Sequence, residues 1–379
     1  MRLGDICTIV SGSTPKSNIP EYWDGDIKWI TPAELNEGTY IINDSVRHIT
    51  KLGVEKTGLK PFPQGTVILS SRAPIGKTAI AGCEMYCNQG FKNLICSDKI
   101  NPRYLYWFLT CNTEYLNSLG RGATFKEISK EIVANIEIPL PAIGRQIAIA
   151  EKFEKVSELI ALRKEQLAKL DQLVKSRFIE LFGDSTHSRN KVLLEDISVF
   201  VTVGIANSAT HAYADNGIVM LRNQNIKENY LDEKDLIYIT PDFAEKYGSK
   251  QLSENDILVI RTGYPGVACL VPKKYEGCQT FTTLIVRLKD STSAHANYVC
   301  HYINSSFGKD YVEQSKVGVA QQNFGAKALA KMPIVVPPME LQEEFATFVE
   351  QTDKSKLAIQ QSLDKLELLK KSLMQEYFG

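Results

Sequence analysis

Two stretches of the chain, one near its middle and one at its end, are copies of each other. A shift of 196 positions, from 167 to 363, superposes LAKLDQLVKSRFIELFG (167–183) on LDKLELLKKSLMQEYFG (363–379), and nine of the seventeen positions are then identical. Unrelated amphipathic helices would share far fewer residues. The chain of 379 residues is therefore a two-copy repeat, and its length exceeds that of one ordinary core and suits two domains of one kind.

The first copy lies in a segment that is expected to be one long helix. Between Arg145 and Phe182 there is neither proline nor glycine, and apolar residues recur at alternating steps of four and three. This spacing predicts a coiled-coil helix, which at 1.5 Å per residue would be roughly 55 Å long. The predicted apolar seam consists of Ile149, Phe153, Val156, Ile160, Leu167, Leu170, Val174 and Leu181.

A single helix of this length with one apolar stripe is not stable alone in water, so it needs a partner helix. The second copy supplies one, and each helix is followed by a glycine, Gly183 or Gly379, that suits a left-handed stop. We predict that the two helices pack on each other and that the seam arginines Arg163 and Arg177 contact the scaffold or a partner and not DNA. The second seam consists of Phe345, Val349, Ile359, Leu363, Leu366, Leu373 and Tyr377, interrupted by Thr352, Lys356 and Lys370.

Before each of these helices the residues predict a mixed domain, and the two domains are similar, which gives an α+β fold class. The strand-like segments 27–30 and 65–70 correspond to 218–221 and 255–260, and Gln89, Phe91 and Leu94 correspond to Gln279, Phe281 and Leu284. Prolines at 139 and 141, and at 337 and 338, end the domains in extended chain. The predicted boundaries are residues 1–142 and 184–338 for the domains, and 143–183 and 339–379 for the helices.

Charge and cysteine usage exclude several simple classes. The chain has 44 basic and 44 acidic residues, and neither domain range departs from balance, with 15 against 14 in 1–142 and 16 against 16 in 184–338. Nucleic-acid binding cannot be argued from net charge. The eight cysteines lack the paired spacing of a zinc site, so buried thiols are expected. Neither a membrane span nor a signal peptide is recognisable, which predicts a cytoplasmic protein.

One segment is close to a nucleotide-binding motif. Residues 71–78, SRAPIGKT, follow a strand and nearly match the phosphate loop G-x-x-x-x-G-K-[ST], which would indicate an ATPase. However, the first glycine of that motif is Ser71 here, and the repeat copy RTGYPGVA (261–268) has no lysine. The five histidines are not grouped as ligands, and no nucleophile elbow or methyltransferase motif is present. We therefore expect a chain without catalytic activity, metal or cofactor.

The order of several phrases, together with the repeat, resembles the specificity subunits of type I restriction-modification systems. These phrases are TPKSNIPEYWDGDIKWITPAEL (14–35), GTVILSSRAPIGKTAI (65–80), NQGFKNLI (88–95), GATFKEIS (122–129), IPLPAIGRQ (138–146) and VVPPMELQ (335–342). The resemblance covers essentially the whole length.

The resemblance implies a fold and a set of partners. It implies that the two long helices form an antiparallel spacer and that each target-recognition domain reads one half of a split, asymmetric site in double-stranded DNA. It also implies that two modification subunits dock on the helices and methylate an adenine in each half, with S-adenosylmethionine bound in those subunits. A separate restriction and translocation subunit would join for cleavage.

Sequence reading requires polar side chains that reach base edges, while phosphate contacts fix position. The loops of the two domains offer candidate DNA-binding residues, in which Asn and Gln suit adenine and Arg suits guanine. In the first domain these are Thr14, Lys16, Ser71, Arg72, Lys77, Arg121, Thr124 and Lys126, and in the second domain Arg222, Asn223, Gln224, Asn225, Arg261, Thr262, Gln321, Gln322 and Asn323.

Other interpretations of these residues remain open. Arg72 and Lys77 could be solvated turn charges, and residues 321–323 could cap a turn. Phe91 and Phe281 suit the core better than a stacking platform. At the level of function, the zero net charge favours a rival hypothesis, a coiled-coil adaptor that joins two protein-binding domains.

Overall fold

The computed structural model describes residues 1–36, 38–72, 74–122, 126–183, 191–206, 209–289, 294–317 and 323–379. These form two compact units, one of Met1–Lys164 with Gln361–Gly379 and the other of Glu165–Gln360. Each unit contains one globular domain and parts of two long helices, α6 (Ile143–Phe182) and α11 (Met339–Phe378). None of the helices in the described ranges is long and apolar enough to cross a membrane.

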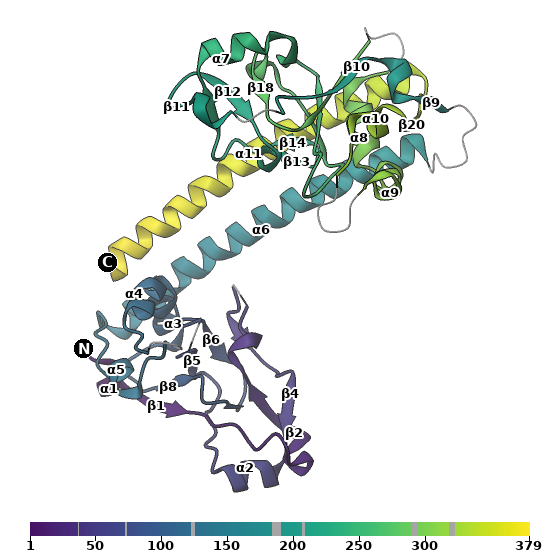
Figure 1. Cartoon of the computed structure of the whole chain (residues 1–379). Helices are drawn as coiled ribbons and strands as arrows, with labels where there is room; N and C mark the ends of the chain where they lie inside the picture. The colour runs from purple at the N-terminus through teal and green to yellow at the C-terminus, as the bar shows by residue number, and fades with distance from the viewer. Residues whose placement is uncertain are drawn as a thin grey trace. The chain divides into compact units, whose positions relative to one another are not determined.

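The globular domain of the first unit contains two sheets (Figure 1). The larger sheet has the order β1-β8-β5-β6-β3, in which only the β3 to β6 pair is parallel. The smaller has the order β4-β2-β7. The strands are β1 (Cys7–Ser11), β2 (Trp23–Ile30), β3 (Ile41–Ile42), β4 (Arg47–Ile49), β5 (Val67–Leu69), β6 (Thr78–Ala81), β7 (Tyr86–Cys87) and β8 (Lys92–Cys96).

Five short helices accompany these sheets. They are α1 (Leu3–Ile6), α2 (Lys51–Thr57), α3 (Pro102–Cys111), α4 (Thr113–Ser118) and α5 (Lys130–Ala134). Helix α3 begins where the side chain of Asn101 accepts a hydrogen bond from the Arg103 N–H, and Pro102 stands at the first helical position, where its missing N–H costs nothing. Its residues 104–109 are all buried, so α3 lies within the core.

The second unit repeats this plan and adds short strand pairs. One sheet has the order β10-β19-β16-β17 and another the order β11-β15-β12-β18, and two pairs, β13 with β14 and β20 with β9, complete the set. The strands are β9 (Lys191–Leu193), β10 (Ser198–Val203), β11 (Tyr213–Ala214), β12 (Ile218–Leu221), β13 (Ile226–Lys227), β14 (Tyr230–Leu231), β15 (Ile237–Ile239), β16 (Ile257–Val259), β17 (Ala268–Leu270), β18 (Gln279–Thr280), β19 (Leu284–Leu288) and β20 (Pro333–Val335). The helices are α7 (Pro241–Lys246), α8 (Ala296–Asn304), α9 (Ser306–Ser315) and α10 (Ala326–Ala330).

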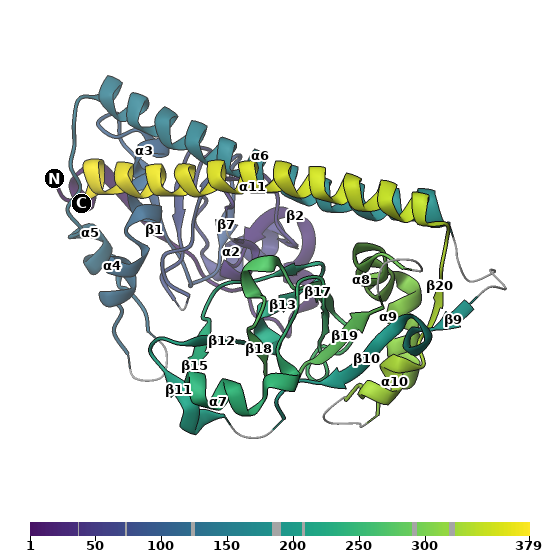
Figure 2. The same ribbon diagram turned by 90° about the horizontal axis from the view of Figure 1, so that it is seen from above.

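Contacts between α6 and α11 show that they run antiparallel (Figures 1 and 2). In the first unit, Lys152 Nζ donates to the Tyr377 hydroxyl at 2.9 Å, and Arg163 Nε donates to Ser362 Oγ at 3.3 Å. In the second unit, Lys356 Nζ lies 2.6 Å from Asp171 Oδ1, and Arg177 pairs with Glu344. As numbers rise along α6 they fall along α11, which confirms the predicted fold class of two mixed domains with an antiparallel helix pair.

All fifteen apolar seam residues named from the sequence are buried or half-buried. Two phenylalanines outside that seam, Phe178 at 5% and Phe378 at 9% exposure, are also buried. Phe378 stacks on Phe153 with ring centroids 5.6 Å apart, and Phe178 meets Phe345 edge-on at 5.4 Å. Each domain core therefore contacts the first part of the helix that follows it and the last part of the other helix.

A buried glutamine joins each globular domain to the start of its helix. Gln146 accepts from the Asn101 N–H at 2.8 Å and donates to Pro141 O at 2.8 Å. Gln342, its repeat counterpart, accepts from the His295 N–H at 2.8 Å and donates to Pro337 O at 2.8 Å. Both side chains are fully buried, and these hydrogen bonds satisfy the amide groups that burial removes from water. The phrases IPLPAIGRQ and VVPPMELQ thus encode the same junction twice.

His301 makes the second unit sensitive to acid. Burial, aided by the charges of Lys356 and Lys175, lowers the pKa of this histidine to about 3, although Glu228 opposes the shift. As pH falls below about 6.5, the unfolded chain takes up a proton at this site that the native chain does not, so stability falls with falling pH. We expect this site to cost up to about 2 kcal/mol between pH 6.5 and 5.

Urea titrations of the wild type and of His301→Gln at pH 7 and pH 5, in which hydrogen exchange and mass spectrometry follow the unfolding of residues 165–360, measure this effect. The wild type should lose more stability on acidification than the variant, whose glutamine does not titrate. Equal losses in the two proteins would show that His301 is not the acid-sensitive group.

Candidate nucleic-acid interface

In the first domain, hydrogen bonds link the turn-rich loop after β1 to the side chains of Trp23, Trp29 and Gln89. The Trp23 indole N–H donates to Lys16 O at 3.2 Å, and Thr14 Oγ1 donates to Gln89 Oε1 at 2.5 Å. Trp29 likewise donates to Ser13 O at 3.0 Å. Thr14 and Lys16 remain exposed. The loop is therefore held in place by buried rings while its predicted DNA-binding side chains face solvent.

A cavity of about 400 Å³ lies beside this loop. Arg72 and Lys77 are its two cationic lining residues, and Lys77 Nζ donates to Pro32 O at 3.3 Å. The cavity thus brings two of the predicted residues together, next to Gln89 and so next to Thr14. Its full lining is Thr31, Pro32, Ala33, Arg72, Pro74, Lys77, Asn88, Gln89 and Gly90.

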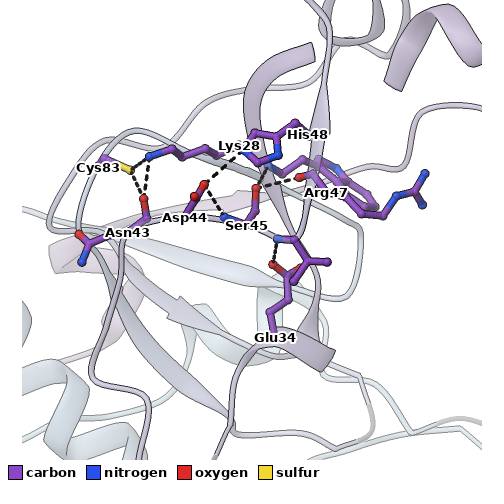
Figure 3. A network of polar contacts seen from close by, with 10 residues as sticks. Lys28, Glu34, Asn43, Asp44, Ser45, Arg47, His48 and Cys83 are labelled. Atoms are coloured by element: carbon purple, nitrogen blue, oxygen red, sulfur yellow. Dashed lines mark hydrogen bonds and ion pairs between the residues drawn. The ribbon is translucent and has the colours of Figure 1, made fainter. Parts of the chain in front are cut away.

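A polar network holds the wall of the cavity formed by the turn η2 (Pro32–Glu34) (Figure 3). The Glu34 carboxylate accepts from the Thr31 N–H at 2.7 Å and from the Val46 N–H at 2.8 Å. Ser45 accepts from the Trp29 N–H at 2.9 Å and donates to Arg47 O at 2.7 Å. These bonds connect the turn to strands β2 and β4, so the cavity wall does not depend on a bound ligand.

The next part of the site is a shared carboxylate. Glu127 accepts from Arg72 Nε at 2.9 Å and from Lys92 Nζ at 3.1 Å. Burial opposes its ionisation, but the hydrogen bonds from Arg72 and Lys92 prevail and lower the Glu127 pKa. The carboxylate is therefore charged at neutral pH and orients both cations.

The prediction that Ser71 contacts DNA is wrong. Its side chain is fully buried, and its Oγ accepts from Lys92 Nζ at 3.2 Å. Backbone bonds to two distant segments explain the error, because the Ser71 N–H donates to Gly90 O at 2.7 Å and Ser71 O accepts from the Ile128 N–H at 2.9 Å, while Arg72 is 45% exposed.

Arg121 and Glu127 flank a second candidate segment of the first domain. The backbones of Arg121 and Glu127 exchange hydrogen bonds of 3.0 and 2.9 Å. The side chains of Arg121 and Lys126 are exposed, as a DNA contact requires. Thr124 lies outside the described residues.

In the second domain, the turn η6 (Asn223–Asn225) takes the place of η2. The Arg222 N–H donates to Asn225 Oδ1 at 3.0 Å, and Asn225 Nδ2 donates to Asp232 O at 3.0 Å and to Lys234 O at 2.9 Å. Asn225 is fully buried, so its prediction as a DNA contact is corrected: it closes the turn, as Glu34 does in the first domain. Gln224 is exposed.

Four other predicted residues of the second domain form two hydrogen-bonded pairs. Asn223 Nδ2 donates to Thr262 Oγ1 at 3.2 Å, and Arg261 Nε donates to Asn323 Oδ1 at 3.1 Å. Arg222 Nη2 bonds to Asp235 O at 2.5 Å. Gln321 and Gln322 lie outside the described residues.

Residues 70, 76 and 77 make the same closing backbone hydrogen bonds as residues 260, 266 and 267, although the side chains near them differ. The Gly76 N–H bonds to Ser70 O at 3.1 Å, and the Gly266 N–H bonds to Ile260 O at 2.9 Å. Both glycines have φ of +93°, a left-handed conformation that other residues rarely adopt. The pairings of Arg72 with Glu127 and of Thr262 with Asn323 also correspond.

This geometry excludes the nucleotide loop considered from the sequence. The Gly76 N–H is used by Ser70 O, and the Lys77 N–H by Ser70 Oγ at 2.9 Å. A phosphate loop needs such amides free to surround a phosphate chain.

The structure also reveals residues that were not selected from the sequence. Lys92 and Glu127 hold Arg72, and Tyr264, 83% exposed, extends from the 260–267 loop. A large aromatic residue within a turn-forming segment that also contains Arg, Thr and Gly is a sequence signal that could have identified Tyr264. No local pattern indicates that Lys92 and Glu127 meet, because 35 positions separate them.

Comparisons with known proteins give one consistent result. Residues 1–172 and 191–369 match the family described as "Type I restriction modification DNA specificity domain". The chain is 38% identical over 193 residues to the type I restriction enzyme MjaIX specificity subunit of Methanocaldococcus jannaschii, a match that spans 50% of this chain and 45% of that relative. It is 25% identical to the StySPI specificity subunit of Salmonella potsdam, with 98% and 86% covered.

Solved structures have the same fold. A chain from a study of complex assembly and conformational transition of the type I restriction-modification system matches with a TM-score of 0.62 at 18% identity, covering 100% of this chain and 96% of that one. The type I specificity subunit of M. genitalium matches with a TM-score of 0.57 at 14% identity, covering 100% and 95%.

Proposed function

The chain belongs to the type I restriction-modification DNA specificity family, and from this premise we propose that it is the non-catalytic subunit that selects the DNA site of a modification and restriction complex. In this proposal, the first domain reads one half of a split site in double-stranded DNA and the second domain reads the other half. The observation that carries it is the pattern of closing backbone hydrogen bonds that Ser70, Gly76 and Lys77 share with Ile260, Gly266 and Val267, while the outward side chains Arg72 and Thr262 differ.

Different side chains on one backbone suit the reading of two different half-sites. The first domain presents Arg72 and Lys77 where the second presents Thr262 and Val267. Amides and arginines at base edges discriminate adenine and guanine, while threonine methyls can contact thymine. Among the described residues, the proposed contacts are Thr14, Lys16, Arg72, Lys77, Arg121 and Lys126 in the first domain, and Arg222, Asn223, Gln224, Arg261, Thr262, Tyr264 and Asn323 in the second.

The long helices are proposed to set the gap between the half-sites and to dock two modification subunits. Each helix has forty residues, about 60 Å at 1.5 Å per residue. Leu173 of α6 and Leu369 of α11 occupy the same repeat position, and both are about half exposed, at 50% and 45%. Two equivalent apolar positions support one modification subunit per helix. In this proposal S-adenosylmethionine belongs to those subunits.

The rival hypothesis of a protein-binding adaptor predicts no sequence preference for DNA. Footprinting of the chain assembled with its modification subunits separates the two. Absence of any sequence-selective protection would contradict the proposed function.

A domain exchange tests the division of labour directly. Replacing residues 1–142 with the corresponding domain of a relative should change one half of the methylated site and leave the other half and the gap unchanged. Sequencing of methylated adenines in cells carrying each version measures this. The matched control is exchange of residues 184–338, which should change only the opposite half, and a change in both halves from one exchange would contradict the assignment.

A further inference from the structure

We infer that the cavity between η2 and the 70–77 loop binds a phosphodiester group of the DNA backbone, and that the second domain lacks this contact. The inference rests on the proposed function and adds an asymmetry to it: one half of the site is held through its backbone by Arg72 and Lys77, and the other half is not held in this way.

The cavity offers positive charge with free donor capacity. An ammonium group has three N–H donors and a guanidinium has five. Pro32 O takes one donor of Lys77, and Glu127 takes the Nε donor of Arg72, whose side chain is 45% exposed. Gln89 and Asn88, also in the lining, add amide groups at the same opening.

One carboxylate stands near these cations and must be counted. Glu127 is ionised and would repel a phosphate, but it is paired with both Arg72 and Lys92. Three cations, Arg72, Lys92 and Lys77, therefore face one anion, which leaves a positive balance. Because Lys92 is almost fully buried, the cations that a ligand can reach are Arg72 and Lys77.

The same place in the second domain has lost these charges. The bonds that close the 260–267 loop put Thr262 at the position of Arg72 and Val267 at the position of Lys77. The Thr262 hydroxyl is used by Asn223 Nδ2. Thr262 and Val267 offer a phosphate no charge, and the neighbouring cations Arg222 and Arg261 are bonded to Asp235 O and to Asn323 Oδ1. The second domain must therefore hold its half-site by other contacts.

The chemistry favours a backbone phosphate over a base. Both cations belong to a cavity whose wall is held by Glu34 and strand β2, and a fixed concave site with two cations suits a compact anion. A phosphate contact contributes to every DNA sequence alike, whereas a base contact contributes only at its own sequence. Free phosphate compounds share the chemistry and are distinguished in the experiment.

The experiment measures the salt dependence of DNA binding by the full chain assembled with its modification subunits. Wild type, Arg72→Gln with Lys77→Gln, and the charge-matched control Lys51→Gln with Lys56→Gln, two exposed lysines of α2, are compared on a cognate duplex and on an unrelated duplex. Each phosphate contact contributes a slope of about 0.9 in log affinity against log salt. With one phosphate contact removed, the Arg72 and Lys77 variant should lose about 0.9 in slope and bind about 5-fold more weakly at 0.15 M salt, equally on both duplexes.

Ethylation of individual phosphates identifies the contact. It should block wild-type binding at a phosphate of one half-site, and the double variant should be insensitive at that phosphate. The control should keep the wild-type slope and ethylation pattern. Melting temperatures of all three proteins establish that they are folded.

Three results would overturn the inference. An unchanged slope in a folded Arg72 and Lys77 variant would remove the phosphate contact while the proposed function stands. A loss confined to the cognate duplex would assign these residues to a base. A melting-temperature shift of the wild type with inorganic phosphate or ATP that the variant lacks, without a change in DNA binding, would assign the cavity to a free phosphate compound. Failure of the proposed function itself is distinguishable, because the wild-type complex would then show no sequence-selective binding.

Discussion

Replacement of Phe153 by alanine should cost the first unit about 3–5 kcal/mol of stability. Phe153 is fully buried, and its ring stacks on Trp107 of α3 at 5.3 Å and on Phe378 of α11 at 5.6 Å. The substitution removes buried apolar area and leaves a cavity where one globular domain meets both helices. Because the surrounding side chains are closely packed, they cannot move in to fill this cavity.

Phe345→Ala is the counterpart in the second unit. Its ring, also fully buried, contacts Phe178 at 5.4 Å, Phe182 at 5.6 Å and His301 at 5.0 Å. A loss of the same size is expected there. Because the chain has two compact units, one denaturation midpoint is not an adequate measure.

Hydrogen exchange followed by mass spectrometry resolves the units. Phe153→Ala should speed exchange in residues 1–164 and 361–379, and Phe345→Ala in residues 165–360. Leu368→Ala is the control, because this helix residue is 68% exposed and should cost no more than about 0.5 kcal/mol. A Phe153 variant as stable as the Leu368 control would contradict the packing described.

The second large effect concerns the proposed docking of modification subunits. Leu173→Arg and Leu369→Arg put a charge at the two equivalent exposed positions of the helices. A residue central to an interface commonly contributes 2–4 kcal/mol or more, so each substitution should weaken its subunit's binding by about 30-fold to 1,000-fold. Methylation should fall accordingly, while the isolated chain keeps its stability.

The single variants distinguish one docking site from two. Each single variant should bind one modification subunit, and the double variant none, as measured by mass photometry and by methylation of each half-site. Lys365→Ala, an exposed change on the same helix, is the control. If the double variant still assembles with two modification subunits, these leucines do not form the docking surface.

Local sequence pattern was sufficient for the helices and for the duplication. A step of four and three is a property of neighbouring turns, so α6 and α11 could be predicted without knowledge of any distant contact. The repeat then predicted that the contacts between one helix and its domain have counterparts at the other helix. The buried glutamines Gln146 and Gln342 fulfil this requirement in detail.

The sequence could predict which loops form the candidate site, but not which of their side chains face it. The phrase containing Ser71 and Arg72 was placed at the site, yet the structure directs Ser71 inward to Lys92 and Arg72 outward to the cavity. Asn225 has the composition of an adenine contact but closes its own turn. The direction of a side chain in an irregular loop depends on bonds to distant segments, which one sequence does not display.

The sequence by itself determined the two-copy plan, the long helices, the mixed domains and the loops that differ between them, because each of these is written in residues close together along the chain. Only the tertiary structure decided that the end of each helix closes the core of the other copy's domain, through Phe378 and Phe178, and that Arg72 and Lys77 meet at one cavity in the first domain alone. The physical reason is that the free energies of burial and of charge pairing depend on residues far apart in the chain. These free energies arise only when folding brings those residues into contact.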